Sequence, residues 1–302
     1  MKHTPDSSRL AGGSSPQVLA LIAQSRLLPW QIRRKAIASM MSFASDCNLE
    51  ERRSVIDHCK SFGPSQNKSG EIGPIWQFWA QGAENAPPLV KTCLRSVESS
   101  AGNRKRILLT NDNIADYLDI PGDLMDRIPF WGLTKFSNLL RLMLLEKYGG
   151  TWIDATVLID KAIPTWIENR SLFFYRWPNN PRILATWFMH AFSGHPLIGA
   201  ISTAYQDYWR NTQVQLDYFM FHYLIEAVVL SRADLSHAFK DVPFHDAMIP
   251  HELQWRLAWP FNKEEYQAIL STSPIQKLTY KIDGVRKDVP TYLSVLTSEF
   301  LT

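Results

Sequence analysis

The sequence predicts an α/β fold, because a helix, a glycine turn and a strand follow one another in the middle of the chain. Residues 135–148 carry apolar side chains at helical spacing, the pattern of a helix packed on a core. Gly149 then stands where a helix C-terminus needs a residue with positive φ. β-Branched and aromatic residues favour a strand over 151–157. A short apolar run predicts another buried strand at 107–110, ahead of this helix.

Length and composition are consistent with one large α/β domain plus an appended element. The chain has 302 residues, of which 45% are hydrophobic, so a sizeable core is expected. Its net charge of +3 and pI near 8.7 mildly favour anionic partners such as sugar diphosphates or an acidic membrane surface. The basic residues form no nucleic-acid-like tract, and nucleic acid is not an expected partner.

Cysteine usage and hydropathy predict a cytoplasmic protein. The three cysteines have no metal-type C-x-x-C spacing, and their odd number favours a reducing compartment over a disulfide framework. The N-terminus lacks the pattern of a signal peptide, and no apolar run approaches the about 18 to 20 residues of a transmembrane helix.

The chain divides at a linker. Residues 1–70 are predicted to form an N-terminal helical extension and linker, and residues 71–302 the α/β domain. The extension carries apolar helical patterns with interspersed basic residues. It could contact an anionic bilayer peripherally at the inner face of the cell membrane, or bind a partner. A cap on the α/β domain or a dimer contact is the structural alternative.

One carboxylate and one hydroxyl follow the predicted glycine turn. In a continuous strand, period 2 places Asp154 and Thr156 on one side. Mg²⁺ and Mn²⁺ prefer such hard oxygen ligands, with phosphate oxygens and water completing the shell. Arg141 stands on the preceding helix, where its guanidinium suits a diphosphate; a salt bridge to a core carboxylate is the alternative.

Several segments between residues 71 and 282, taken in order, resemble the capsular polysaccharide synthesis glycosyltransferases. These are DXD-type sugar transferases related to the yeast initiating mannosyltransferases and the glucosylating clostridial toxins. The order and spacing of the segments carry the resemblance, which would be weak from any one of them. They span residues 74–82, 87–90, 93–96, 108–113, 135–141, 148–156, 207–209, 216–222 and 275–281.

The resemblance implies a GT-A type fold, a nucleotide-sugar-binding α/β fold with a mixed central sheet flanked by helices. It also implies that a sugar moves, with retention, from a nucleotide sugar, with UDP-sugar favoured, to a saccharide or lipid-linked oligosaccharide acceptor in bacterial capsular or surface polysaccharide synthesis. A divalent metal, Mn²⁺ or Mg²⁺, would accompany the donor.

The chain departs from the family pattern at two positions. Asn138 replaces the aspartate of the usual Ser-Asp-x-x-Arg helix motif, which removes a charge. Thr156 stands at the second acidic position of the metal motif, as is common in the capsular branch, so metal affinity should be lower than for an Asp-x-Asp site and metal dependence is open.

The residues predicted to act on the sugar donor fall into three groups. Asp154 and Arg141 are the predicted catalytic residues, and Asp154 and Thr156 the predicted metal ligands. The predicted nucleotide-sugar-binding residues are Trp76, Gln77, Asp112, Ser137, Asn138, Arg141, Trp152, Lys277 and Lys281. Several of these residues also have structural explanations: Trp76 as a core residue, Asp112 as a helix cap, and the two lysines as ordinary surface residues.

Acceptor binding is assigned to Trp177, Asp217 and His222. Trp177 belongs to a segment rich in aromatic residues, which suit sugar rings, although packing explains most buried tryptophans. Two other functions remain open. One is a non-catalytic binding subunit of a capsule assembly complex, and the other a phosphotransferase that moves a sugar phosphate.

Overall fold

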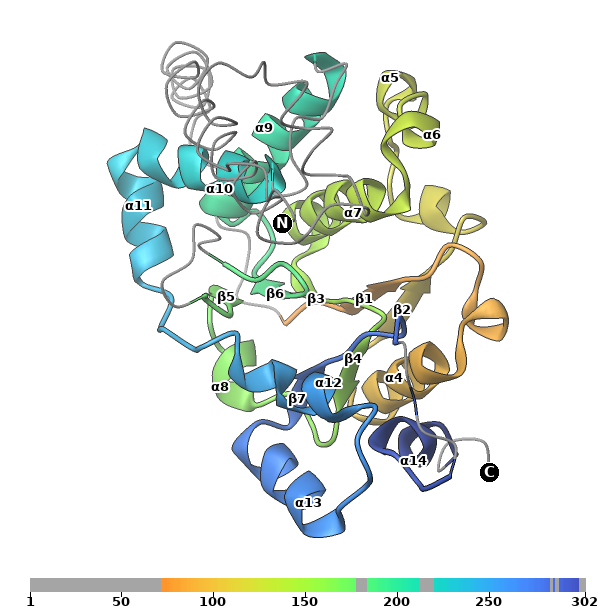
Figure 1. The fold of residues 1–302 in the computed structure, drawn as a ribbon. Helices are drawn as coiled ribbons and strands as arrows, with labels where there is room; N and C mark the ends of the chain where they lie inside the picture. Colours follow the sequence, from red (N-terminus) through yellow and green to blue (C-terminus); the bar gives the residue numbers. More distant parts are fainter. Residues whose placement is uncertain (1–71, 178–183, 212–219, 283–284, 286–287, 299–302) are drawn as a thin grey trace, which may run out of the picture.

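A five-stranded mixed sheet forms the centre of the molecule. The computed structural model describes residues 72–177, 184–211, 220–282, 285 and 288–298. The strand order is β2-β1-β3-β6-β5 (Figure 1); β1 pairs in parallel with β2 and β3, whereas β6 pairs antiparallel with β3 and β5. The strands are β1 (Ile75–Phe78), β2 (Arg106–Leu109), β3 (Gly150–Ile153), β5 (Leu172–Phe174) and β6 (Phe188–Ala191).

Helices cover both faces of this sheet. In Figure 1, α7, α9 and α10 lie above it, and α4, α8, α12, α13 and α14 lie below. The helices are α4 (Pro88–Ser99), α5 (Gly122–Met125), α6 (Ile128–Trp131), α7 (Leu133–Tyr148), α8 (Thr165–Glu168), α9 (Pro196–Asn211), α10 (Met220–Ser231), α11 (Ala233–Lys240), α12 (Glu252–Arg256), α13 (Lys263–Thr272) and α14 (Tyr292–Ser298). Short 3₁₀ helices occupy Ala83–Asn85, Ile114–Asp116 and Ile249–His251. This arrangement confirms the predicted fold class.

A second, two-stranded sheet lies beside the first. It pairs β4 (Val157–Ile159) antiparallel with β7 (Ile275–Lys277), near the C-terminus. A separate small core, which includes Leu158 and Tyr292, packs the C-terminal helices against it. This sheet brings a C-terminal strand next to residues from the middle of the chain.

The predicted helix and glycine turn are confirmed. α7 buries its apolar stripe and ends at Gly149, which has φ +65°. The predicted continuous strand over 151–157 is wrong, because β3 ends at Ile153 and β4 begins at Val157 in the other sheet. The backbone turns between them, and the Val157 N–H donates to the Asp154 carbonyl over 2.9 Å.

None of the helices in the described part of the chain is long and apolar enough to cross a membrane. The predicted extension over 1–70 lies outside the described residues, so its proposed bilayer, capping and dimer contacts stay predictions.

A buried polar network holds the amino-terminal end of β3. The Arg104 guanidinium donates to the Thr151 hydroxyl over 2.9 Å, and this hydroxyl lies 2.8 Å from Nδ1 of His190. Burial, and then the positive charge of Arg104, lower the pKa of His190 from 6.5 to about 4. Burial lowers the pKa of His195 to about 4 as well. Both rings are therefore neutral in the folded protein at pH 7.

We expect stability to fall as the pH drops from 6.5 toward 4, because the unfolded chain binds protons at these histidines before the folded protein does. At pH 5 the loss from His190 is about 2 kcal/mol. Guanidinium unfolding at pH 7.5 and pH 5.0 measures it, and His190→Gln should shrink the difference between the two free energies by that amount. The exposed His237→Gln variant is the control. An undiminished difference in His190→Gln would contradict the assignment.

Candidate active site

Asp154 lies at the carboxyl edge of the parallel strands, directly after β3. Its backbone N–H donates to the Trp187 carbonyl over 2.9 Å, which continues the pairing of β3 with β6 by one residue. Ligand sites of open α/β sheets form at this edge. The Asp154 side chain is 26% exposed, so it is held by the fold and still accessible to a ligand.

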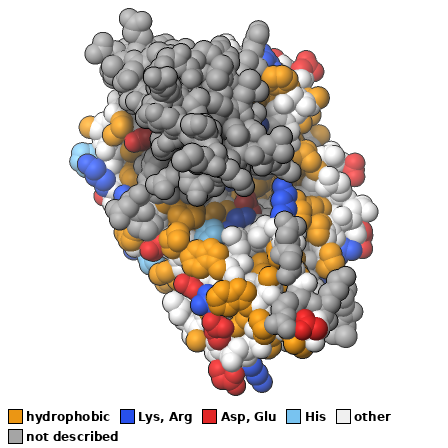
Figure 2. Space-filling view, in the orientation of Figure 1, with side chains coloured by type: hydrophobic (Ala, Val, Ile, Leu, Met, Phe, Trp, Pro, Cys, Tyr) orange, Lys and Arg blue, Asp and Glu red, His pale blue; other side chains and the backbone are white. Residues whose placement is uncertain are grey.

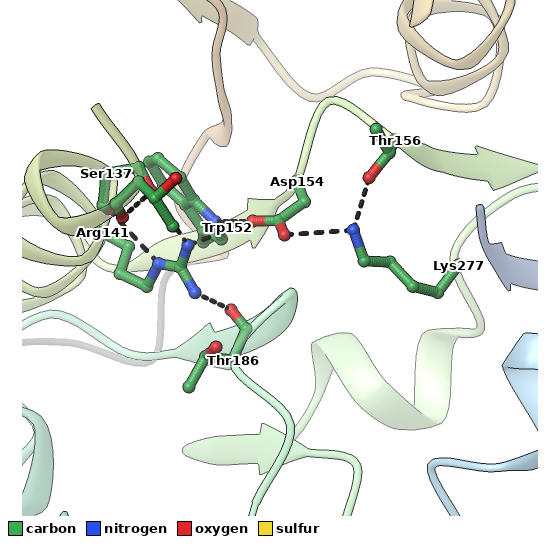
Figure 3. Close-up of polar contacts among 8 residues, drawn as sticks. Ser137, Arg141, Trp152, Asp154, Thr156, Thr186 and Lys277 are labelled. Atoms are coloured by element: carbon green, nitrogen blue, oxygen red, sulfur yellow. Dashed lines mark hydrogen bonds and ion pairs between the residues drawn. The ribbon is translucent and has the colours of Figure 1, made fainter. Parts of the chain in front are cut away.

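Three donors from three parts of the chain meet at the Asp154 carboxylate (Figure 3). Its Oδ1 accepts from the indole N–H of Trp152 over 2.9 Å and from the Arg141 guanidinium over 3.1 Å. Its Oδ2 lies 3.3 Å from the ammonium of Lys277. The carboxylate is therefore fixed in orientation, with one cation on each oxygen.

Arg141 is 4% exposed and held on several sides. It donates to the backbone carbonyls of Ser137 and Thr186 and to the Ser137 hydroxyl, and it stacks 5.0 Å from the centre of the Trp152 ring. The sequence allowed two interpretations of Arg141, a ligand of the diphosphate and a salt bridge to a carboxylate. The salt bridge is present, and its carboxylate is that of Asp154, so it lies within the predicted site. The Thr186 contact was missed, because a backbone carbonyl leaves no signal in the sequence.

Lys277 comes to Asp154 through the second sheet. Its pairing with Val157 puts it beside the turn after β3, and the Leu278 N–H donates to the Thr156 carbonyl over 2.8 Å. The Lys277 ammonium also contacts the hydroxyl of Thr156. The prediction that Asp154 and Thr156 share a strand face is wrong, yet both side chains point to one ammonium group.

The predicted metal ligands are already engaged by cations. Asp154 accepts from Arg141 and Lys277, and Thr156 contacts Lys277. Within the described ranges, no three His, Cys, Asp or Glu side chains come together as a metal site. Because the Asp154 carboxylate is paired with two cationic side chains, which would repel a divalent ion, this donor set does not fit such an ion.

Comparison with known proteins agrees with the sequence prediction. Residues 48–296 match the capsular polysaccharide synthesis protein family. The chain belongs to that family. The match begins upstream of the boundary predicted near residue 70. Among solved structures, "PaToxG Glycosyltransferase" is similar at 12% identity and a TM-score of 0.42, covering 66% of this chain and 83% of its own. No curated protein matches the chain.

Two predicted nucleotide-binding residues of this capsular polysaccharide synthesis protein lie in its core. Trp76 is 1% exposed and its indole donates to the Gly149 carbonyl over 2.9 Å. Gln77 is fully buried, and its side-chain carbonyl accepts from Arg106 over 2.9 Å. Both sit in the middle of β1, so neither reaches the carboxyl edge. The alternative of a core role holds for Trp76.

Trp79 and Tyr280 occupy that edge instead. Trp79 directly follows β1 and packs beside Ala155, and Tyr280 follows the strand that carries Lys277. Their rings meet edge to face with centres 5.7 Å apart, and Tyr280 is 41% exposed. The sequence did not reveal this pair, because no local signal marks where the four-residue strand β1 ends.

Asp112 lies at the same edge, in the exposed turn after β2. It does not occupy the cap position of the following 3₁₀ turn, because Asn113 takes that place. The Asn113 side chain bonds backward instead, accepting from the Thr110 N–H over 2.8 Å. The carboxyl ends of β2 and β3, which precede Asp112 and Asp154, are about 10 Å apart, because β1 lies between the two strands.

The remaining residues predicted to bind the nucleotide sugar lie close to Arg141 on α7 or at the exposed surface. The Ser137 hydroxyl bonds to the Thr134 carbonyl and to Arg141, so it supports the guanidinium. Asn138 is half-buried and directly follows Ser137 on α7. Lys281 is exposed, with its ammonium 5.9 Å from the Tyr280 ring.

Of the predicted acceptor residues, the two that the structure describes lie in different parts of the fold. Trp177 is half-buried and packs against His251 with ring centres 5.2 Å apart. His222 lies in α10, which packs mainly against α9 and α11. Asp217 lies outside the described residues. Figure 2 shows a hollow on one face of the molecule with basic side chains at its floor and hydrophobic side chains around it.

Proposed function

We propose that this protein is a retaining glycosyltransferase that moves a sugar from a nucleotide sugar to a saccharide or lipid-linked acceptor in bacterial capsular or surface polysaccharide synthesis. The observation that carries the proposal is the Asp154 carboxylate, held at the carboxyl edge of the sheet between Arg141 and Lys277. Membership of the capsular polysaccharide synthesis protein family supports a role in polysaccharide synthesis. The reaction would take place in the cytoplasm, at the inner face of the membrane where a lipid-linked acceptor is available.

The chemistry required is stabilisation of a leaving diphosphate. The bond between the anomeric carbon and the β-phosphate oxygen breaks, and its electrons stay on the diphosphate. The acceptor hydroxyl bonds to the carbon and passes its proton to the departing phosphate oxygen. Cations aimed at the developing charge usually lower the barrier of such reactions more than any other group. Arg141 and Lys277 are the cations at this site, and Asp154 fixes both in place.

The donor base would bind at Trp79 and Tyr280. The two rings stand at the same sheet edge as Asp154, and Tyr280 is only three residues from Lys277. An aromatic ring binds any base through its face. UDP is the favoured nucleotide from the family resemblance.

A non-catalytic nucleotide-sugar-binding subunit is the second candidate function. Asn138 and Thr156 favour it, because each replaces an acid that the family pattern carries. Such a subunit would bind a nucleotide sugar without breaking it.

A release assay tests the proposal. Purified protein is incubated with UDP-, GDP-, ADP- and CMP-activated sugars in Mn²⁺, in Mg²⁺ and in EDTA, and free nucleotide is measured together with thermal shifts. We expect slow hydrolysis of one donor, since water replaces the acceptor. A thermal shift without release, persisting when oligosaccharide and lipid-linked acceptors are supplied, would favour the binding subunit. No release and no shift from any nucleotide would refute both functions.

A further inference from the structure

The ammonium group of Lys277 occupies the place that the predicted metal ion would take. It contacts Thr156 and lies 3.3 Å from Oδ2 of Asp154, the two side chains of the predicted metal motif (Figure 3). These contacts are made by a side chain that is only 19% exposed. This lysine is therefore part of the site.

Backbone pairing fixes Lys277 in this position. The β4–β7 ladder aligns it with Val157, and a hydrogen bond from Leu278 to the Thr156 carbonyl closes the ladder on the site side. An ordinary surface lysine has no such constraint. The sheet thus delivers a positive charge to the turn that carries Asp154.

The charges at the site oppose a divalent ion. One carboxylate faces the guanidinium of Arg141 and the ammonium of Lys277, so the three side chains sum to a charge of +1. An added Mn²⁺ or Mg²⁺ would be repelled by both cations and would have to displace one of them from Asp154. A diphosphate, by contrast, is attracted to this arrangement without further ions.

We propose that Lys277 is the built-in cation of this protein and that it binds the diphosphate of the donor without a divalent metal. This proposal rests on the glycosyltransferase function proposed above and replaces the expected Mn²⁺ or Mg²⁺. The ammonium group contacts the phosphate oxygens, with Arg141 reinforcing the charge from the other side of Asp154. Asp154 then acts as a positioning group for the two cations.

Calorimetric titration of UDP, GDP, ADP and CDP into the protein, once in EDTA and once in Mn²⁺, tests this proposal apart from turnover. We expect one diphosphate to bind wild type with dissociation constants within about twofold in the two conditions. Lys277→Met keeps most of the length of the side chain and removes its charge. Binding in EDTA should therefore weaken at least about tenfold, as expected for a lost charge-assisted hydrogen bond to phosphate. Lys277→Arg should retain most of the affinity.

Lys105→Met is the matched control, because Lys105 is exposed and precedes β2 at the opposite edge of the sheet. It should bind like wild type. Equal melting temperatures for the Lys277 variants and wild type would confirm that they fold.

Three results would overturn the proposal. They are wild-type binding that disappears in EDTA and returns with Mn²⁺, undiminished binding by Lys277→Met, and no binding of any diphosphate in either condition. Donor hydrolysis in Mn²⁺ separates the two proposals: turnover that requires the metal refutes the role of Lys277 and leaves the glycosyltransferase function standing.

Discussion

Asp154→Asn is expected to lower kcat/KM for the donor identified in the release assay at least about 100-fold, the effect of losing a group that organises charge stabilisation. The amide keeps the shape of the side chain but removes the charge that holds Arg141 and Lys277. Both cations then lose the partner that orients them toward the donor.

The fold should survive this change. Arg141 keeps its bonds to Ser137 and Thr186, and the partly exposed position of Asp154 lets water reach the pair, so we expect a stability loss of about 1 to 2 kcal/mol. Guanidinium unfolding and initial rates measure the two effects separately. Asp160→Asn, an exposed carboxylate beyond β4, is the control and should retain wild-type rates. Wild-type turnover by Asp154→Asn would show that the site lies elsewhere.

Gly150→Ala is expected to destabilise the protein by at least about 3 kcal/mol. Gly150 has φ +98°, outside the region open to other residues, and a Cβ there would lie 2.1 Å from the Pro74 carbonyl oxygen. That oxygen accepts the Thr151 N–H over 2.9 Å, so relieving the clash breaks the start of the β1–β3 pairing.

Gly82→Ala separates the two causes of this loss of stability, the backbone strain of a positive φ and the steric clash of the added Cβ. Gly82 also has positive φ, +79°, but no atom lies within 4 Å of the position that a Cβ would take, so only backbone strain of about 1 to 2 kcal/mol applies. Guanidinium unfolding of both variants gives the steric part as their difference. Equal losses in the two variants would contradict the steric argument.

Local patterns were enough to predict much of the architecture. The apolar stripe and Gly149 identified α7 and its end, because helix periodicity and a positive-φ stop depend on neighbouring residues only. The same stretch led to Arg141 and Asp154, which the structure joins directly. These two residues come together from adjacent elements.

Features set by distant pairing could not be predicted in this way. The break between β3 and β4 arises because Val157 pairs with Lys277, 120 residues further along the chain, and no local signal marks that partner. The position of Lys277 against the carboxylate has the same origin. For Trp76, the alternative of a core role was correct, but only the length of β1 shows that Trp79 reaches the edge.

The turn after β3 has a mechanical consequence. Asp154 bonds to Arg141, which is anchored on the large sheet and its helices, and to Lys277, which belongs to the small sheet. A single carboxylate therefore links the two sheets. The small sheet packs on two sides, because Val157 and Ile275 belong to the main core and Leu158 to the C-terminal core. Any sliding of the small sheet changes the gap between the two cations. Leu158 and Tyr292, which are buried in the C-terminal core, therefore help to set how well that gap matches the span of a diphosphate.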